Sequence, residues 1–152
     1  MIEVWAASGD EGHEASAQQR LGTARSGERA RSRVLVVDDD LSILDTVTSI
    51  LEGEGYQVMA ANGGEEATSL MRSWHPTLVL LDMRMPAMDG WAVARAMHES
   101  GSRVPIVVMT AAENAMRWAD EIGAAGHLAK PFTLDDLIDC VDRFTGRDER
   151  PN

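Results

Sequence analysis

The fold is decided by the stretch Leu78-Val79-Leu80-Leu81-Asp82-Met83-Arg84-Met85-Pro86-Ala87-Met88-Asp89-Gly90. It begins with an unbroken apolar run, which is typical of a strand buried on both faces of a sheet. The run ends in a carboxylate at Asp82, and Pro86 and Asp89-Gly90 then mark a turn before a helical pattern. An ionised Asp at the end of a buried strand is costly to desolvate unless a partner neutralises it. A lone Asp at such a position is more often a helix cap or solvent-exposed, so its meaning depends on the rest of the chain.

The composition is that of a globular protein with a single domain: 152 residues, 44% hydrophobic and 26% charged, with a net charge of −11. The acidity argues against a surface for nucleic acid or anionic membrane, because either would need a basic patch. The single cysteine, Cys140, excludes a disulfide framework within the chain. Neither a signal peptide nor an apolar run of about 18 residues is present. We therefore expect a cytoplasmic protein.

The chain divides into a polar first part and a patterned remainder. Residues 1–32 are rich in small and polar side chains, and glycines interrupt any helical stripe. We expect a disordered tail over residues 1–32, a folded domain over residues 33–146 and a short C-terminal tail over residues 147–152. The strands expected in the domain are residues 34–37, 57–60, 78–81, 106–109 and 126–129. Strands that alternate strictly with helices predict a doubly wound α/β fold, a five-stranded parallel sheet with helices on both faces.

Apolar residues recur at helical spacing between the expected strands. The stripes are Ile43, Leu44, Val47, Ile50 and Leu51; Ala67, Leu70, Met71 and Trp74; Val93, Ala94 and Met97; Met116, Ala119 and Ile122; and Leu134, Leu137, Ile138, Val141 and Phe144. Thr133 and Asp136 have the spacing of a capping box for the last helix. Trp118 lies off the fourth stripe, so we expect it to be partly exposed.

Reactive side chains follow the expected strands. They are Asp38, Asp39 and Asp40 after the first strand, Asp82 after the third, Thr110 after the fourth and Lys130 after the fifth. Ligands of doubly wound sheets bind at this carboxyl edge. Clustered carboxylates repel one another unless a cation neutralises them, and Mg²⁺ prefers such oxygen ligands. Lys130 is the only lysine in a chain whose other cationic side chains are all arginine, which favours a role for its compact charge. The set predicts a place for Mg²⁺ and a phosphoryl group that a carboxylate attacks.

The region from residue 33 to about residue 144 resembles the receiver domain of two-component response regulators. The resemblance is carried by Val36-Val37-Asp38-Asp39-Asp40, Leu81-Asp82-Met83-Arg84-Met85-Pro86, Met88-Asp89-Gly90, Met109-Thr110-Ala111 and Leu128-Ala129-Lys130-Pro131-Phe132. Each motif is modest alone, but their shared order makes the match specific. The resemblance implies a flavodoxin-like sheet with strand order 2-1-3-4-5.

The resemblance also implies a metal-dependent phosphoacceptor site. Asp82 is expected to accept a phosphoryl group from a phosphohistidine. Asp38 and Asp39 are expected to hold Mg²⁺ together with Asp82, with Asp39 the more direct ligand. The backbone carbonyl of Arg84 is expected to complete the metal site, and no other cofactor is implied.

The remaining expected roles belong to the switch. Thr110 is expected to move and bond the phosphoryl group, and Lys130 to pair with it. The peptide bond before Pro131 is typically cis in the family. His127 stands where the family usually has Tyr or Phe; it is either a half-exposed histidine without a special role or a ring that swings inward when Thr110 moves. The interval from Thr110 to Lys130 is about two residues shorter than is common, which predicts a shortened or displaced fourth helix.

The leading functional hypothesis is a stand-alone receiver that is a phosphorylatable signalling switch rather than an enzyme, because residues 145–152 are too few for an output domain. The expected partners are a sensor histidine kinase or histidine phosphotransfer protein and a downstream protein on the face of the fourth helix, fifth strand and fifth helix. We expect a monomer or a weak phosphorylation-linked dimer, with no nucleic acid and no membrane partner.

The alternative is a phosphatase with an Asp nucleophile, but that class requires a second acid at the position where this chain has Arg84. A flavodoxin-like cofactor binder would need a glycine-rich phosphate loop where this chain has Asp38-Asp39-Asp40.

Overall fold

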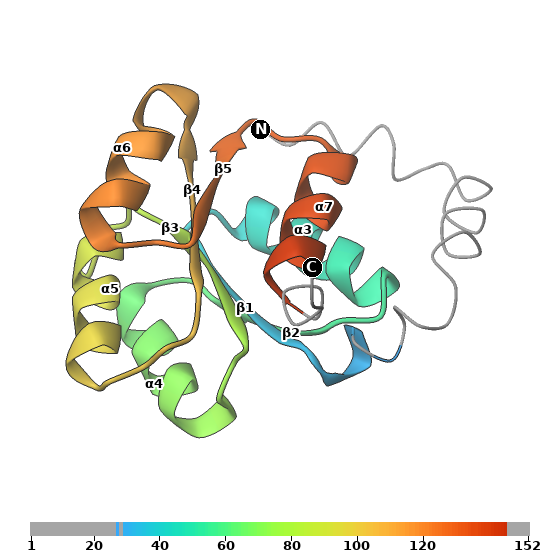
Figure 1. Ribbon diagram of the computed structural model, residues 1–152, viewed down its shortest axis with the longest axis horizontal. Helices are drawn as coiled ribbons and strands as arrows, with labels where there is room; N and C mark the ends of the chain where they lie inside the picture. Colours follow the sequence, from blue (N-terminus) through green and yellow to red (C-terminus); the bar gives the residue numbers. More distant parts are fainter. Residues whose placement is uncertain (1–26, 28, 146–152) are drawn as a thin grey trace, which may run out of the picture.

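The computed structural model of this protein describes residue 27 and residues 29–145. Its parallel sheet consists of β1 (Arg33–Val37), β2 (Gln57–Ala61), β3 (Leu78–Asp82), β4 (Ile106–Ala111) and β5 (Gly126–Lys130). The helices are α3 (Leu41–Gly53), α4 (Gly64–Trp74), α5 (Gly90–Glu99), α6 (Ala112–Ile122) and α7 (Leu134–Phe144). The strand order is β2-β1-β3-β4-β5, which confirms the predicted fold class and its flavodoxin-like order (Figure 1).

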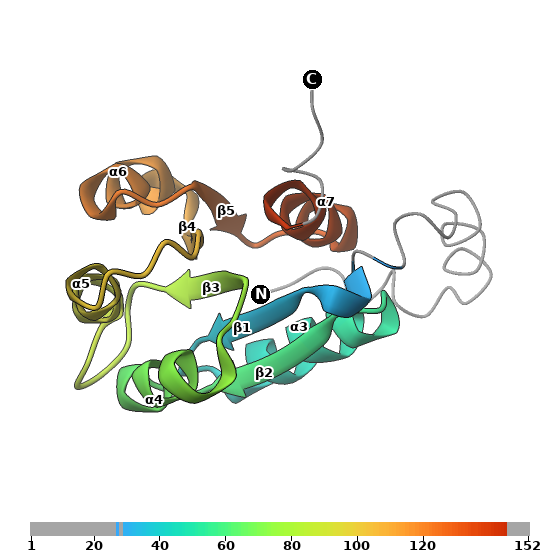
Figure 2. The ribbon, with the colours of Figure 1, turned by 60° about the horizontal axis from the view of Figure 1, so that its bottom comes forward.

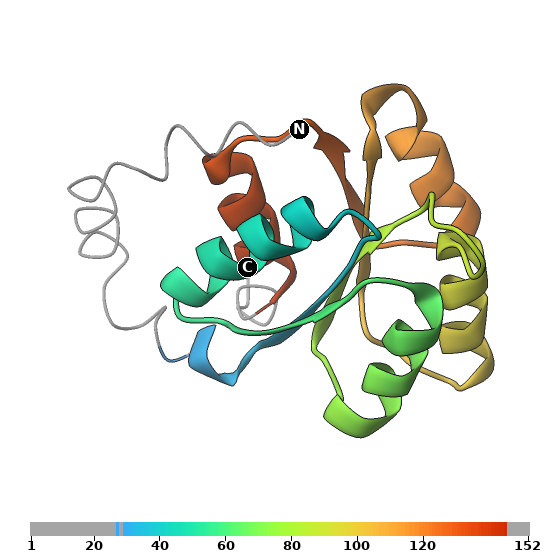
Figure 3. The same ribbon diagram turned by 180° about the vertical axis from the view of Figure 1, so that it is seen from behind.

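The helices cover the sheet from both sides (Figures 2 and 3). α3 and α7 pack on one face, and α4, α5 and α6 pack on the other. In β3, Leu78 and Leu80 belong to the core under α3 and α7, whereas Val79 and Leu81 belong to the core on the other face. Successive side chains of a strand point to opposite faces, so a strand that is covered on both faces has no polar alternation. This explains the apolar run before Asp82.

The fourth helix, predicted to be shortened or displaced, is not shorter than the last helix, and its buried face differs from the predicted stripe. Thr110 lies in β4, which runs into α6 with no residue between them, and α6 is as long as α7 at 11 residues. The short interval to Lys130 is therefore realised at the junction of β4 and α6, not by a shorter helix. Met116 is 66% exposed and Trp118 is 6% exposed, the reverse of what the stripe predicted. The buried face includes Ala115 and Trp118 because Trp118 packs edge-to-face on Trp91, with 4.9 Å between ring centroids.

The boundary of the predicted N-terminal tail is wrong at its end. Residues 1–26 and 28 of the predicted tail lie outside the described residues, as do residue 146 and the predicted C-terminal tail. Residues 29–31 are helical, and Arg29 and Ser32 are buried. The chain is therefore ordered before β1 begins at Arg33. The cause is an ion pair between Arg29 and Asp142 of α7, which no local apolar pattern reveals.

Within residue 27 and residues 29–145, no helix combines the length and the apolar character that crossing a bilayer would require.

Candidate phosphoacceptor and metal site

The predicted site residues meet at the carboxyl edge of the sheet. β1 and β3 are neighbours, with Val37 opposite Leu81, so the residues that follow them come together. β5 lies beyond β4, where Ala111 is opposite Lys130. The strand order therefore delivers acids, a hydroxyl and an ammonium to one edge, although they are spread over much of the sequence.

Three carboxylates form a group that has the geometry to hold a metal ion. One oxygen each of Asp38, Asp39 and Asp82 lies within 4.8 Å of the others, and this is the only such group found among the residues that the structure describes. Asp38 already accepts a hydrogen bond from the Asp40 N–H at 3.0 Å through Oδ1 and one from Lys130 at 2.8 Å through Oδ2. Asp39 is exposed, so its carboxylate is more accessible to an ion than that of Asp38. The oxygen donor set fits Mg²⁺.

Lys130 contacts both buried acids. Its ammonium lies 2.8 Å from Asp38 Oδ2 and 3.8 Å from Asp82 Oδ1. The side chain of Asp38 is 1% exposed and that of Lys130 is 19% exposed, so the closer pair is largely screened from water. One ammonium does not neutralise three carboxylates, and the site keeps a negative charge that a divalent cation would offset. The peptide bond between Lys130 and Pro131 is cis.

Burial and the charge of Asp38 raise the pKa of Asp82 to about 7, against the opposing effects of Lys130 and of a hydrogen bond from the Arg84 N–H. This N–H donates to Asp82 Oδ1 at 3.3 Å. Asp82 is 5% exposed, so it ends a buried strand as the sequence predicts. A cation beside the carboxylate would favour its ionised form and lower its pKa.

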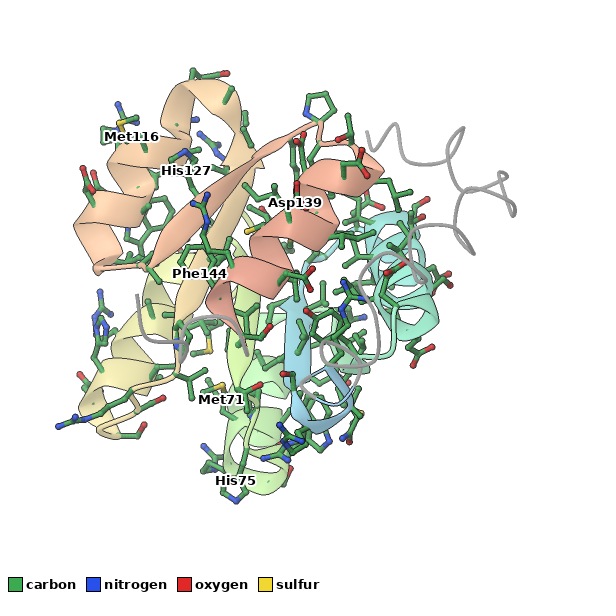
Figure 4. All side chains as sticks on the ribbon, turned by 45° about the vertical axis from the view of Figure 1, so that its right-hand side comes forward. Met71, His75, Met116, His127, Asp139 and Phe144 are labelled. Carbon is green, nitrogen blue, oxygen red and sulfur yellow. The ribbon has the colours of Figure 1, made fainter. Side chains whose placement is uncertain are left out.

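Thr110 and His127 occupy different environments. Thr110 is buried in β4, 5% exposed, on the strand beside Asp82. His127 is exposed on β5, with Met116 of α6 on one side and Asp139 of α7 on the other (Figure 4). The ring is therefore at the outer surface, and its coupling to Thr110 stays a prediction. The metal-binding role of the Arg84 carbonyl also stays a prediction.

Sequence reasoning missed one contact at the rim of the site. The guanidinium of Arg84 lies over the ring of Trp118, 5.2 Å from its centroid. Arg84 follows β3 and Trp118 lies in α6, so no local spacing signals the contact. It links the loop that follows Asp82 to α6, the helix that follows β4.

Comparison with known proteins agrees with this geometry. Residues 34–142 match the family model of the response regulator receiver domain. The chain is 33% identical over 114 residues to sporulation initiation phosphotransferase F of Bacillus subtilis (strain 168), covering 74% of this chain and 92% of that protein. It is 37% identical over 124 residues to the DNA-binding response regulator MtrA of Mycolicibacterium paratuberculosis, covering 80% of this chain but 55% of that protein. The chain thus spans about half the length of MtrA.

A solved structure gives the same result. The chemotaxis protein CheY4 of Vibrio cholerae superposes with a TM-score of 0.68 at 30% identity, covering 74% of this chain and 98% of that chain. Three observations agree: the fold, the cluster of acids beside Lys130, and the family match over residues 34–142. The chain belongs to the response regulator receiver domain family of two-component signalling.

Proposed function

We propose that Asp82 accepts a phosphoryl group from a phosphohistidine donor in a reaction that requires Mg²⁺. The observation that carries the proposal is the convergence of Asp38, Asp39 and Asp82 within 4.8 Å beside the ammonium of Lys130. Phosphoryl transfer needs positioning and positive charge more than covalent help from the protein. This edge of the sheet has the groups for both.

In the proposed reaction, a carboxylate oxygen of Asp82 attacks the phosphorus of the donor. The P–O bond forms as the P–N bond breaks, and the imidazole nitrogen keeps the electron pair and takes up a proton. A bound Mg²⁺ supplies positive charge that stabilises the transferring phosphoryl oxygens. Lys130 adds a positive charge from β5, and Thr110 offers a hydroxyl from β4. Asp38, Asp39 and Asp82 would hold the ion, with Asp39 as the exposed ligand, and the backbone carbonyl of Arg84 would complete the site.

The protein is proposed to be a switch and not an enzyme that turns over a separate substrate. Its donor would be a sensor histidine kinase or a histidine phosphotransfer protein, as expected for a response regulator. The name of sporulation initiation phosphotransferase F supports onward phosphotransfer as one output, since the match covers 92% of that relative. We propose that the receiver acts alone in this way, in the cytoplasm, as a monomer or a weak phosphorylation-linked dimer.

A downstream protein is proposed to bind the face of α6, β5 and α7. This face exposes Met116 and His127 and has a hollow of about 650 Å³ between β5 and α7. The net charge of −11 supports a protein partner over nucleic acid or an anionic membrane.

The test is incubation of the purified chain with acetyl phosphate and Mg²⁺, followed by intact mass spectrometry. We expect a single phosphoryl adduct that is lost in Asp82→Ala and in excess EDTA. Asp45→Ala is the matched control, because Asp45 is an exposed acid in α3, and it should be labelled as the unaltered protein is. An adduct that persists in Asp82→Ala would refute the assignment. Continuous release of phosphate without an adduct would instead favour a phosphatase.

A further inference from the structure

Arg29 inserts its guanidinium into the base of the domain, far from the phosphoacceptor site. It precedes β1 and is 4% exposed. Its Nε donates to Asp142 Oδ1 at 3.2 Å and its Nη2 donates to Asp142 Oδ2 at 2.8 Å. The pair is bidentate, the geometry that makes Arg–carboxylate recognition strong and directional. It joins residues 113 positions apart in the sequence.

The guanidinium is enclosed by a second acid and an aromatic ring. Its Nη1 lies 3.0 Å from Glu54 Oε1 and donates to the Glu54 carbonyl at 3.2 Å. The Tyr56 ring centroid lies 5.6 Å from the guanidinium carbon, and the Tyr56 hydroxyl donates to Asp142 Oδ1. Carboxylates in two directions and an aromatic face are the features of an arginine-binding pocket. We define this pocket by Glu54, Tyr56 and Asp142.

The pocket connects three parts of the fold. Glu54 follows the end of α3, Tyr56 precedes β2, and Asp142 lies in the last turn of α7. The family match begins at residue 34, so Arg29 lies outside the region shared with the receiver family. The pocket therefore binds a side chain that comes from outside the region that the family model matches.

The last turn of α7 also presses on β5. A Cβ at Gly126 would lie 2.7 Å from the Phe144 ring, so this ring sits directly against the first residue of β5. Thr145 completes the contact with the pocket, because its hydroxyl lies 3.2 Å from the Tyr56 hydroxyl. The last turn of α7 is thus held by the pocket on one side and packs against β5 on the other.

We propose that residues 29–32 form a strap, with Arg29 as its anchor in the pocket, and that the strap holds the C-terminal end of α7 in place. Asp142 is 3% exposed, and a buried carboxylate that loses its cation is strongly destabilising. Withdrawal of Arg29 therefore loosens the last turn of α7. By linkage, any partner that engages the strap changes the mobility of α7, and any partner that moves α7 changes the hold on the strap.

The test is hydrogen exchange of the full chain, read at the amides of α7. Arg29→Ala should speed exchange in the last turn of α7 by roughly tenfold or more, because it removes the bidentate cationic partner of a buried carboxylate. Arg31→Ala is the matched control, since Arg31 lies in the same helical turn and is exposed. Asp142→Asn should reproduce the effect, whereas Asp139→Asn, an exposed acid of the same helix, should not. Equal exchange in Arg29→Ala and Arg31→Ala would overturn the proposal.

Arg29→Lys keeps the test decisive if Arg29→Ala does not fold, because lysine retains the charge but not the bidentate fork. Arg29→Lys should give an intermediate acceleration, and adding Asp142→Asn to it should add little. Independent, additive effects of the two changes would contradict a shared pocket. Labelling of Asp82 by acetyl phosphate should persist in Arg29→Lys, so the strap and the phosphoacceptor site can fail separately.

Discussion

Lys130 lies closer to Asp38 than to Asp82: its ammonium is 2.8 Å from Asp38 Oδ2 and 3.8 Å from Asp82 Oδ1. The ammonium is therefore paired with the acid that follows the first strand while it remains near Asp82, the proposed phosphoacceptor. The charge of Asp38 disfavours ionisation of Asp82, and the ammonium of Lys130 opposes this effect. Lys130 thus lies near both acids, and under the proposed function it would also pair with a phosphoryl group on Asp82.

Lys130→Met should slow the accumulation of the phosphoryl adduct by about 10²-fold, the typical effect of removing one group that stabilises developing charge. Lys130→Arg keeps the charge but replaces a compact ammonium with a planar fork. Its rate of adduct formation should therefore lie between that of Lys130→Met and that of the unaltered protein. The measurement is the adduct fraction against time by intact mass spectrometry. Unchanged kinetics in Lys130→Met would exclude a role for this ammonium in the transfer.

Asp82 should make the metal-free protein less stable as the pH rises. Its pKa is about 7 in the folded chain against an ordinary value of 3.8. Between these values the folded chain retains a proton that the unfolded chain releases, so stability falls up to about pH 7 and is then constant. Asp82→Asn lacks this titration. The unfolding free energy of Asp82→Asn minus that of the unaltered protein should grow by about 1–3 kcal/mol between about pH 5 and pH 7.5.

Urea unfolding in EDTA at both pH values measures this difference. Saturating Mg²⁺ should shrink the difference at the higher pH, because the ion favours the ionised carboxylate of the unaltered protein. A difference that is the same at both pH values would show that Asp82 titrates normally.

The sheet and its site were predictable because they follow from strand order and strand ends. A strand buried on both faces, such as β3, has an unbroken apolar run, and parallel strands end at one edge. Asp38, Asp82 and Lys130 could therefore be placed together from the sequence. The distances between these three side chains could not be predicted, because they depend on the conformation of the loops that follow the strands.

The buried face of α6 and the anchor of the strap were not predictable from local pattern. Met116 and Trp118 are both apolar, and only the packing of Trp118 on Trp91 decides which one is covered. Arg29 lies in a polar segment, and its burial depends on Asp142, far along the sequence. Sequence periodicity predicts neither the burial of Trp118 nor that of Arg29, because tertiary contacts determine both.

Trp118→Ala should lower the unfolding free energy by about 3–5 kcal/mol, as expected for a buried tryptophan replaced by a small side chain. Trp118 is 6% exposed, whereas Met116 of the same helix is 66% exposed. Met116→Ala is therefore the matched control, and it should change stability by no more than about 0.5 kcal/mol. Urea unfolding of both variants checks the prediction. A larger loss in Met116→Ala than in Trp118→Ala would mean that α6 buries the face that its sequence stripe suggests.

Ala87→Gly should stabilise the protein by about 0.5–1 kcal/mol, because glycine adopts positive φ without the steric cost that alanine bears. Ala87 has φ 65° in the loop between β3 and α5. The loop is held in this conformation, since the next residue, Met88, packs so tightly on α4 that a Cβ at Gly64 would lie 2.5 Å from its Cγ. The strain at Ala87 is therefore not relieved by a small shift of the loop.

The matched control is Ala96→Gly in the interior of α5, where glycine should lower stability by about 1 kcal/mol through the loss of helix propensity. The same substitution thus has opposite signs at two positions, because only one of them has positive φ. Thermal and urea unfolding at a fixed pH and Mg²⁺ concentration measure both. A loss of stability in Ala87→Gly similar to that in Ala96→Gly would mean that the loop takes a negative φ at this residue in solution.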